Sequence, residues 1–286
     1  EVTMLLDNGV DLHSYQPTAD DILKISTADL FIYVGGESDE WVDDVLKEAV
    51  NPDMVVIDLL DVLGTSVKEE EVVEGMEGHD HEHEEDAEDH EHEEEAEDHE
   101  HEHEEGEVEY DEHVWLSLRN ASTLVSSISE ALQTIDADNA QTYADNTASY
   151  IEQLDTLDSE YETAVSEGTQ TTVLFGDRFP FRYLVDDYGL SYYAAFVGCS
   201  AETEASFETI TFLAEKIDEL GLNTVLTIEG NEHKIAETII ENTQSKDQQI
   251  LTLDSIQSTT ADDVQNGVTY LSIMENNLEV LKEALK

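Results

Sequence analysis

Leu30-Phe31-Ile32-Tyr33-Val34-Gly35-Gly36 is the stretch that decides the fold, because an apolar run leads directly into a glycine pair. A short, uninterrupted apolar run is typical of a strand buried on both faces, and the glycines predict a turn after it. Upstream, the Pro17–Asp21 segment has the pattern of a helix start, with Thr18 as N-cap and Asp21 near the N3 position. A buried strand next to a helix predicts a parallel sheet in an α/β lobe.

The same alternation continues on both sides of this strand. Val2–Leu6 predicts an earlier strand and Met54–Leu60 a later one, and Ser38 is placed to cap a helix that reaches about Val50. Because the chain opens directly on a strand pattern, we expect a signal segment and a lipid anchor to lie outside it.

A helical region occupies the middle of the chain. Val114–Ile135 has helical spacing, and Ala137–Glu167 follows with no glycine or proline before Gly168. A helix of roughly thirty residues is about 45 Å long at 1.5 Å per residue. We interpret it as a stiff connector between two lobes.

The second half repeats the strand–helix alternation. The predicted strands are Thr172–Phe175, Leu190–Val197, Asn223–Ile228 and Gln249–Leu253. The predicted helices are Phe179–Tyr188, Ser206–Leu220, Glu232–Asn242 and Asp262–Leu285. The expected fold is α/β, with two Rossmann-like (β/α) lobes joined by a long linker helix. The expected units are an N-terminal lobe (1–135, including a His- and acid-rich loop at 77–107), the linker helix (136–168) and a C-terminal lobe (169–286).

The charge of the chain limits its partners. It has 71 acidic residues against 11 lysines and arginines, a formal net charge of -60. Such a field repels nucleic acid and anionic membranes and attracts cations. Strong acidity is typical both of proteins adapted to high salt and of chains engineered for solubility. There is one cysteine, so no internal disulfide can form, and no apolar run reaches membrane-spanning length.

A tract of histidines interleaved with acids precedes the helical region. Eight of the eleven histidines lie in it: His79, His81, His83, His90, His92, His99, His101 and His103. Imidazole and carboxylate both bind borderline divalent cations such as zinc. The tract has no aromatic residue and cannot bury enough surface to fold alone. A solvated linker and a purification tag are the alternatives, but the interleaved acids favour a loop that captures metal.

Further candidate ligands follow predicted strands. His13 lies in a loop before the first helix, His113 follows the acidic tract, and Asp177 and Glu229 come directly after strands of the second lobe. In open α/β sheets, ligands bind at the carboxyl ends of the strands, so we expect these side chains to converge on one cleft. Two neutral imidazoles and a carboxylate make a plausible zinc or manganese site.

At these positions the chain resembles the zinc- and manganese-binding solute receptors of bacterial ABC importers, the cluster A-I group that includes the zinc receptors of the Znu and Adc systems. The matching motifs occur in the family's order and spacing and cover nearly the whole chain. The His-rich acidic loop is a hallmark of the zinc-preferring members. The matching stretches are His13-Ser-Tyr-Gln-Pro-Thr-Ala-Asp-Asp-Ile, Ala28-Asp-Leu-Phe-Ile-Tyr-Val-Gly-Gly-Glu, Asp111-Glu-His-Val-Trp, Gly176-Asp-Arg-Phe-Pro-Phe-Arg-Tyr-Leu and the Glu229 strand end with Lys234-Ile-Ala-Glu-Thr-Ile.

This resemblance implies a metal cleft between the lobes. It implies His13 as the first ligand, His113 as the second and a carboxylate of the second lobe, matching Glu229, as the last. The family's usual third histidine falls here on Asp177-Arg178, and arginine stays protonated and cannot bind metal.

Three alternatives remain for that missing ligand. Asp177 can supply an oxygen, a water molecule can complete the site, or Cys199 can approach as a thiolate. Arg178 can instead pair with Glu204 or Glu229, and Asp111 and Glu112 can orient His113.

The resemblance implies an extracytoplasmic receptor, periplasmic or a cell-surface lipoprotein, that delivers Zn²⁺ to an ABC permease in the membrane. We expect a monomer, no nucleic-acid partner and no enzymatic activity. The alternatives are a manganese receptor of the same family, a zinc buffer or surface adhesin, and a metallo-hydrolase. A hydrolase needs an open metal position, but the sequence offers no obvious general base.

Overall fold

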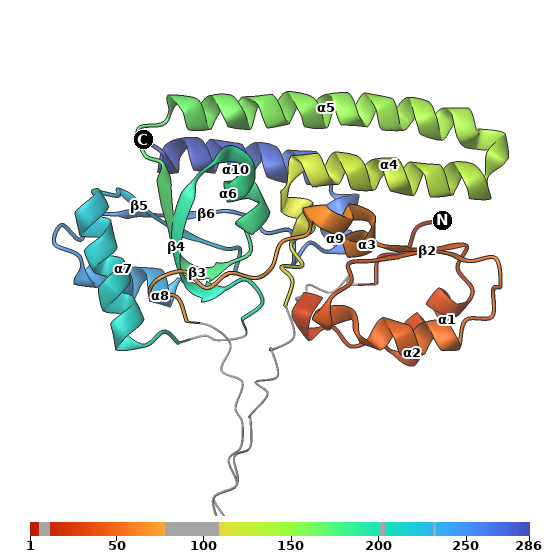
Figure 1. Cartoon of the computed structure of the whole chain (residues 1–286), viewed down its shortest axis with the longest axis horizontal. Coiled ribbons are helices and arrows are strands. Elements are labelled where there is room, and N and C mark those ends of the chain that lie inside the picture. The colour runs from red at the N-terminus through yellow and green to blue at the C-terminus, as the bar shows by residue number, and fades with distance from the viewer. Residues whose placement is uncertain (6–11, 78–108, 201–203, 231–232) are drawn as a thin grey trace, which may run out of the picture.

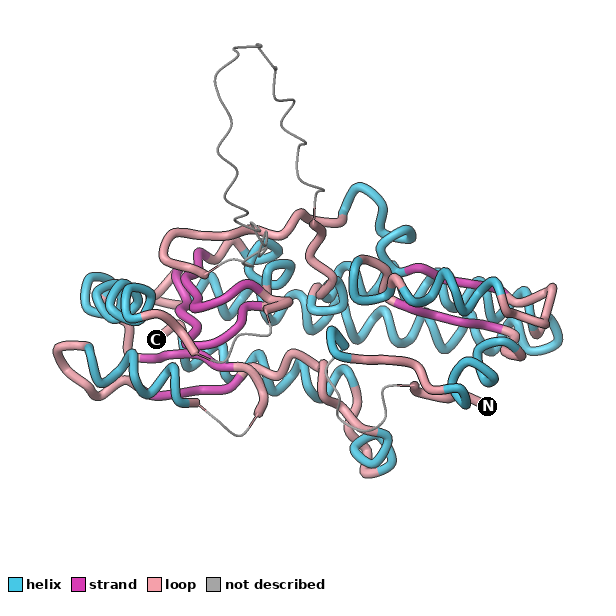
Figure 2. Tube along the Cα trace, turned by 90° about the horizontal axis from the view of Figure 1, so that it is seen from below, coloured by secondary structure: helices cyan, strands magenta, loops and turns pink. Residues whose placement is uncertain are grey.

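The structure of the chain is a computed structural model that describes residues 1–5, 12–77, 109–200, 204–230 and 233–286. Two groups of parallel strands lie toward opposite ends of the molecule, and one long helix runs past both of them (Figure 1). Figure 2, seen from below, shows the same separation of the strands. This two-lobe α/β architecture is the one expected from the alternation of strands and helices.

The N-terminal lobe is built on a two-stranded parallel sheet. Strands β1 (Leu30–Tyr33) and β2 (Val55–Asp58) pair in register, and the helices are α1 (Ala19–Ser26), α2 (Trp41–Lys47) and α3 (Leu59–Leu63). A small core holds the lobe together, formed by Ile25, Phe31, Val42 and Val45. The predicted capping box is confirmed, because the Thr18 side chain accepts from the Asp21 amide while the Asp21 carboxylate accepts from Thr18.

Three predictions about this lobe are wrong in detail. Val2–Leu5 form no strand, and Leu6 lies outside the described residues. The strand at Met54–Leu60 ends at Asp58, because that side chain caps α3 by accepting from the Asp61 amide. Ser38 does not cap a helix: it lies in a 3-10 turn, Glu37–Asp39, and its hydroxyl meets a histidine instead.

Three helices form the upper layer of the molecule (Figure 1). The long helix α5 (Ala140–Glu167) packs against α4 (Leu118–Ile135) of the first half and α10 (Tyr270–Ala284) of the second. Its buried stripe includes Tyr161, whose hydroxyl donates to the Met274 carbonyl at 2.7 Å. The predicted connector helix is therefore present, and it contacts both halves. The exact domain boundaries stay predictions.

The C-terminal lobe is a four-stranded parallel sheet with the order β4-β3-β5-β6. Its strands are β3 (Thr172–Phe179), β4 (Ser191–Val197), β5 (Thr224–Thr227) and β6 (Gln249–Thr252). Its helices are α6 (Arg182–Tyr188), α7 (Phe207–Leu220), α8 (Lys234–Asn242), α9 (Ala261–Gln265) and α10.

Two elements of this lobe differ from the prediction. Strand β3 continues to Phe179, past the glycine expected to end it, with a register irregularity between Phe175 and Arg178. The helix expected from Phe179 therefore begins only at Arg182. The predicted terminal helix is two helices, α9 and α10, because the chain turns at Gly267 with φ +94°.

The acidic tract lies outside the described residues, but the residues on either side of it are placed. Before it, the Glu77 amide donates to the Ala195 carbonyl at 2.9 Å, and Glu77 forms a parallel bridge with Phe196 of β4. After it, Tyr110 forms an antiparallel bridge with Glu69, and the Asp111 amide donates to the Lys68 carbonyl at 2.9 Å. Both ends of the tract are thus bonded to backbone that the structure describes.

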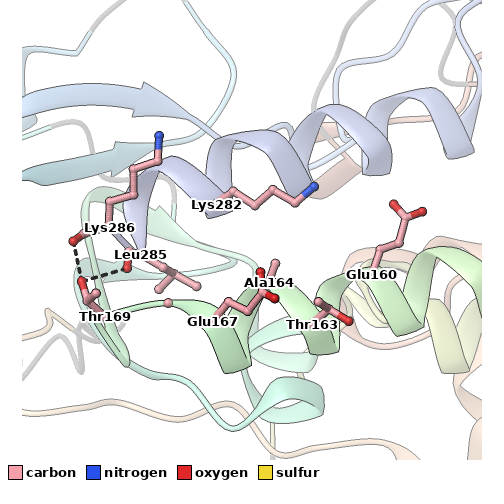
Figure 3. A pocket seen from close by; sticks show the side chains of 9 residues that line it. Glu160, Thr163, Ala164, Glu167, Thr169, Lys282, Leu285 and Lys286 are labelled. Carbon is pink, nitrogen blue, oxygen red and sulfur yellow. Dashed lines mark hydrogen bonds between the residues drawn. The ribbon is translucent and has the colours of Figure 1, made fainter.

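No helix among the described residues has the length and apolar character needed to cross a membrane. A hollow of about 630 Å³ lies between the C-terminal ends of α5 and α10 (Figure 3). Its walls carry both signs of charge, with Glu160 and Glu167 on α5 and Lys282 on α10.

Candidate metal centre

One group of metal-binding side chains stands out among the described residues. It is the only group of three or more His, Cys, Asp or Glu there whose ligand atoms all lie within 4.8 Å of one another, and it consists of His13, His113 and Cys199. His13 lies in the 3-10 turn Leu12–Ser14 of the N-terminal lobe, and Cys199 follows β4 of the C-terminal lobe. His113 directly precedes the turn Val114–Leu116 that leads into α4. The fold therefore brings together residues from both lobes and the segment between them.

His113 is completely buried and held by a carboxylate. Its Nδ1 lies 2.9 Å from Asp111 Oδ1, and the same oxygen accepts the His113 backbone N–H at 2.9 Å. A carboxylate only accepts hydrogen bonds, so the ring proton sits on Nδ1 and the lone pair of Nε2 stays available. Asp111 thus orients His113, as the sequence suggested.

Space for the His113 ring depends on a glycine. A Cβ atom at Gly198 would lie 2.8 Å from His113 Cε1 and 3.0 Å from the Phe179 carbonyl oxygen, closer than side-chain carbons come. The backbone after β4 therefore packs directly against the imidazole. The edge of Trp115 closes another side, with ring centroids 5.5 Å apart.

His13 is held in a similar way by different partners. Its Nδ1 lies 2.7 Å from Ser38 Oγ and 3.4 Å from Glu112 Oε2, while the Ser38 amide donates to Glu112 Oε1 at 2.9 Å. Burial alone would raise the pKa of Glu112, but the hydrogen bonds from His13 and Ser38 bring that pKa below its ordinary value. The predicted partner of Glu112 was His113; the structure places it against His13.

The two imidazoles face each other through their Nε2 atoms. His13 Nε2 and His113 Nε2 are 3.2 Å apart, and the ring centroids are 5.2 Å apart. With the ring proton of each histidine on Nδ1, toward its oxygen partner, both Nε2 lone pairs are directed at the same small volume. A cation between them, whether a proton or a metal ion, satisfies both nitrogens at once.

Cys199 reaches the same point from the other lobe. Burial raises the pKa of its thiol, and the negative charges of Glu112 and Asp111 raise that pKa further. The protonated thiol is therefore the favoured form of this half-buried side chain.

Glu229 and Asp177 lie outside this group. The Glu229 carboxylate accepts hydrogen bonds from the Ser255 amide at 2.7 Å, the Ser255 hydroxyl at 2.8 Å and the Gln257 amide at 3.2 Å. Asp177 is part of β3, accepts from the Arg178 amide at 2.8 Å and the Ile228 amide at 3.3 Å, and has its pKa raised by burial. Their roles as ligands stay predictions.

The remaining sequence-based predictions have different outcomes. Arg178 donates to the Ser200 carbonyl at 3.3 Å, and its ion pair with Glu204 or Glu229 stays a prediction. The eight tract histidines lie outside the described residues. Sequence reasoning missed Ser38 and Gly198 as supports of the two imidazoles. Ser38 carried a visible signal, a polar residue soon after a strand, but it was interpreted as a helix cap.

Comparison with known proteins shows which family this chain belongs to. The family described as zinc-uptake complex component A, periplasmic (ZnuA), matches residues 1–284. The chain belongs to the ZnuA family. The resemblance drawn from the sequence motifs is therefore confirmed.

Curated relatives of the ZnuA family agree. The chain is 30% identical over 282 residues to the zinc-binding protein AdcA of Streptococcus pyogenes, covering 99% of this chain and 51% of AdcA. It is 29% identical over 285 residues to the high-affinity zinc uptake system protein ZnuA of Bacillus subtilis, covering 100% of this chain and 81% of that protein. The chain thus spans about half the length of the AdcA relatives.

Solved structures show the same fold. The Zn(II)-bound ZnuA-like domain of Streptococcus pneumoniae AdcA matches with a TM-score of 0.70 and 26% identity, covering 100% of this chain and 90% of that one. The metal-dependent lipoprotein YcdH of Bacillus subtilis matches with a TM-score of 0.74 and 24% identity, covering 100% of this chain and 91% of that one. The predicted two-lobe α/β fold is confirmed.

Proposed function

We propose that this chain binds Zn²⁺ outside the cytoplasm and delivers it to an ABC importer. The observation that carries this proposal is the pair of buried imidazoles whose Nε2 atoms face each other at 3.2 Å. Zinc-binding names and zinc-bound structures among its relatives support the choice of ion. Imidazole nitrogen also favours zinc over manganese, which prefers oxygen ligands.

His13 and His113 hold the ion, and their carboxylate partners fix the rings. Glu112 and Asp111 each accept toward one Nδ1, which makes both Nε2 atoms better donors to a cation. Glu229 and Asp177 remain proposed oxygen ligands of the second lobe. Glu229 Oε1 accepts from Ser255, Gln257 and Ser258, whereas Oε2 accepts from the Ser255 amide alone among the described residues, so coordination through Oε2 is not excluded.

Transport also requires release of the ion, and the packing of the long helices affects how far the lobes can open for that release. Helix α5 packs on both α4 and α10, so the lobes share a long rigid support. We infer that opening is small and that it separates His13 from Cys199, which belong to different lobes. The acidic histidine tract raises the local zinc concentration through weak multiple contacts.

The rest of the assignment follows the family. The loaded chain docks on a membrane permease, acts as a monomer, and works in the periplasm or as a surface lipoprotein; relatives carry the words periplasmic and lipoprotein. It catalyses no reaction. Zinc is its cargo.

Calorimetric titration of the full chain with zinc tests this proposal. We expect a tight phase in the wild type that weakens by about 100-fold or more in His13→Ala and in His113→Ala, because each variant removes a direct ligand. His233→Ala is the control, since His233 lies outside the group and should leave the tight phase unchanged. An unchanged tight phase in both ligand variants would rule this site out.

Deletion of residues 79–103 tests whether tight zinc binding belongs to the histidine site or to the acidic tract. A receptor keeps its tight site and loses only weak binding. Loss of nearly all zinc binding in the deletion variant would instead identify the tract as a buffer and contradict the receptor assignment.

A further inference from the structure

The third ligand of the cation site is open to inference from the geometry. The two imidazoles supply nitrogen from the N-terminal lobe and from the segment before α4, but a zinc site needs at least one more donor. The resemblance places the family's usual third histidine at Asp177-Arg178 of this chain. Asp177 already accepts two backbone amides, and Arg178 reaches the Ser200 carbonyl.

The distance between the two imidazole nitrogens matches a tetrahedral zinc site. With Zn–N bonds of about 2.05 Å, two nitrogens at a tetrahedral angle are about 3.3 Å apart. The two Nε2 atoms are 3.2 Å apart in the structure. With a Zn–S bond of about 2.3 Å, the sulfur would lie about 3.6 Å from each nitrogen. The Cys199 ligand atom is within 4.8 Å of both, so a small closing of the lobes suffices.

The backbone holds Cys199 at this place. Gly198 packs on the His113 ring so closely that no Cβ fits there, which fixes the path of the chain immediately before the cysteine. Residues of the opposite lobe hold His13, through Ser38 and Glu112. Three donors from three separate segments thus converge, with their ligand atoms all within 4.8 Å of one another.

We propose that Cys199 is the third zinc ligand, taking the place of the family's histidine and giving this chain a His₂Cys site. This inference rests on the proposed function and adds the identity of a ligand to it. When the S–Zn bond forms, the thiol proton leaves to the solvent, and the fourth position is left to an oxygen donor. The ion's positive charge also offsets the negative charges of Glu112 and Asp111, which disfavour a thiolate.

A thiolate ligand has a consequence for selectivity. Sulfur and imidazole ligands suit zinc, whereas manganese favours carboxylate, carbonyl and water. A His₂Cys site should therefore reject manganese more strongly than a site completed by histidine or carboxylate.

Cobalt spectroscopy of the full chain tests this proposal. Co²⁺ can stand in for Zn²⁺, and a thiolate–cobalt bond gives a charge-transfer band in the near ultraviolet. Because Cys199 is the only cysteine of the chain, such a band can come from no other residue. We expect the band with one equivalent of Co²⁺, at an intensity per protein that does not change on dilution.

The matched variant is Cys199→Ser, which keeps the size of the side chain. We expect it to lose the charge-transfer band, to bind zinc at least about tenfold more weakly, and to discriminate less between zinc and manganese. The charge-transfer band of the wild type tests the proposal by itself, so a folding defect in Cys199→Ser would not prevent the test.

The outcomes separate the two proposals. Visible cobalt bands that depend on His13 and His113, without a charge-transfer band, would overturn the role of Cys199 and leave the receptor assignment standing. Tight zinc binding that survives His13→Ala and His113→Ala would instead remove the receptor site itself.

Discussion

At the scale of single residues, a carboxylate fixes the proposed ligand His113. Asp111 Oδ1 accepts from both the ring and the backbone of His113, so one side chain fixes the tautomer and the position of the imidazole. This follows a general rule for metal-binding histidines, whose second nitrogen is held by an oxygen.

Asp111→Asn should therefore weaken zinc binding although it removes no ligand. We expect a loss of about 10- to 100-fold, because the amide keeps the shape but not the charge that favours the correct tautomer. Competition with a chromophoric chelator measures this loss of zinc affinity. Asp138→Asn, at an exposed position far along the chain, is the control. Equal affinities in wild type and Asp111→Asn would mean that Asp111 only builds the turn.

Glu70 gives a prediction for stability against pH. Burial and the nearby Asp111 and Glu109 raise its pKa from 4.5 to about 7, although the Cys199 amide donates to it. A carboxyl with a raised pKa binds more protons in the folded than in the unfolded chain between these values, so its contribution to stability falls as pH rises through that window.

Glu70→Gln removes this contribution. The free energy of unfolding of the variant minus that of the wild type should increase from pH 5 to pH 8, as measured by urea denaturation. Glu69→Gln, at an exposed neighbouring position, makes the same change in net charge and should show no such trend. A difference independent of pH for Glu70→Gln would contradict the shifted pKa.

At the scale of elements, the turn after β1 links the fold to the site. Gly36 has φ +82°, and a Cβ there would lie 2.4 Å from Glu112 Oε1. Glu112 in turn contacts His13. The Gly35-Gly36 turn, visible in the sequence as the end of a strand, thus makes room for the carboxylate that contacts the proposed ligand His13.

Gly36→Ala should consequently affect both stability and binding. We expect destabilisation of about 1–2 kcal/mol from the left-handed backbone and a weaker tight phase for zinc because Glu112 is displaced. Gly64→Ala separates the two effects, since Gly64 also has positive φ, +51°, but nothing lies within 4 Å of its added Cβ. Equal zinc affinities in the two variants would show that Glu112 adjusts freely.

Local signals predicted most elements, and long-range pairing accounts for the errors. The capping box at Thr18 and the apolar run at Leu30 need only neighbouring residues, so both could be predicted. The extension of β3 depends on Arg178 pairing alongside Phe196 of β4, which overrides a glycine that resembles a turn. No local pattern reveals that partner.

At the scale of the whole molecule, the topology explains why His13 and His113 meet. Both were expected in one cleft because ligands gather where strands end, and the fold brings these two together although a hundred positions separate them. The place of Cys199 could not be predicted in the same way, because a single cysteine is most often a buried apolar residue. Its proximity to the imidazoles depends on how the lobes pack, which no motif encodes.

The backbone bonds on either side of the acidic tract have a consequence for its evolution. Glu77 is tied to β4 and Tyr110 to Glu69, so the insertion begins and ends at stationary points. Doubling the length of a loop between fixed ends costs only about 0.6 kcal/mol of closure entropy. The number of histidine–acid units between these anchors can therefore change at little cost in stability, so the proposed capacity for weak metal capture can vary independently of the proposed tight site.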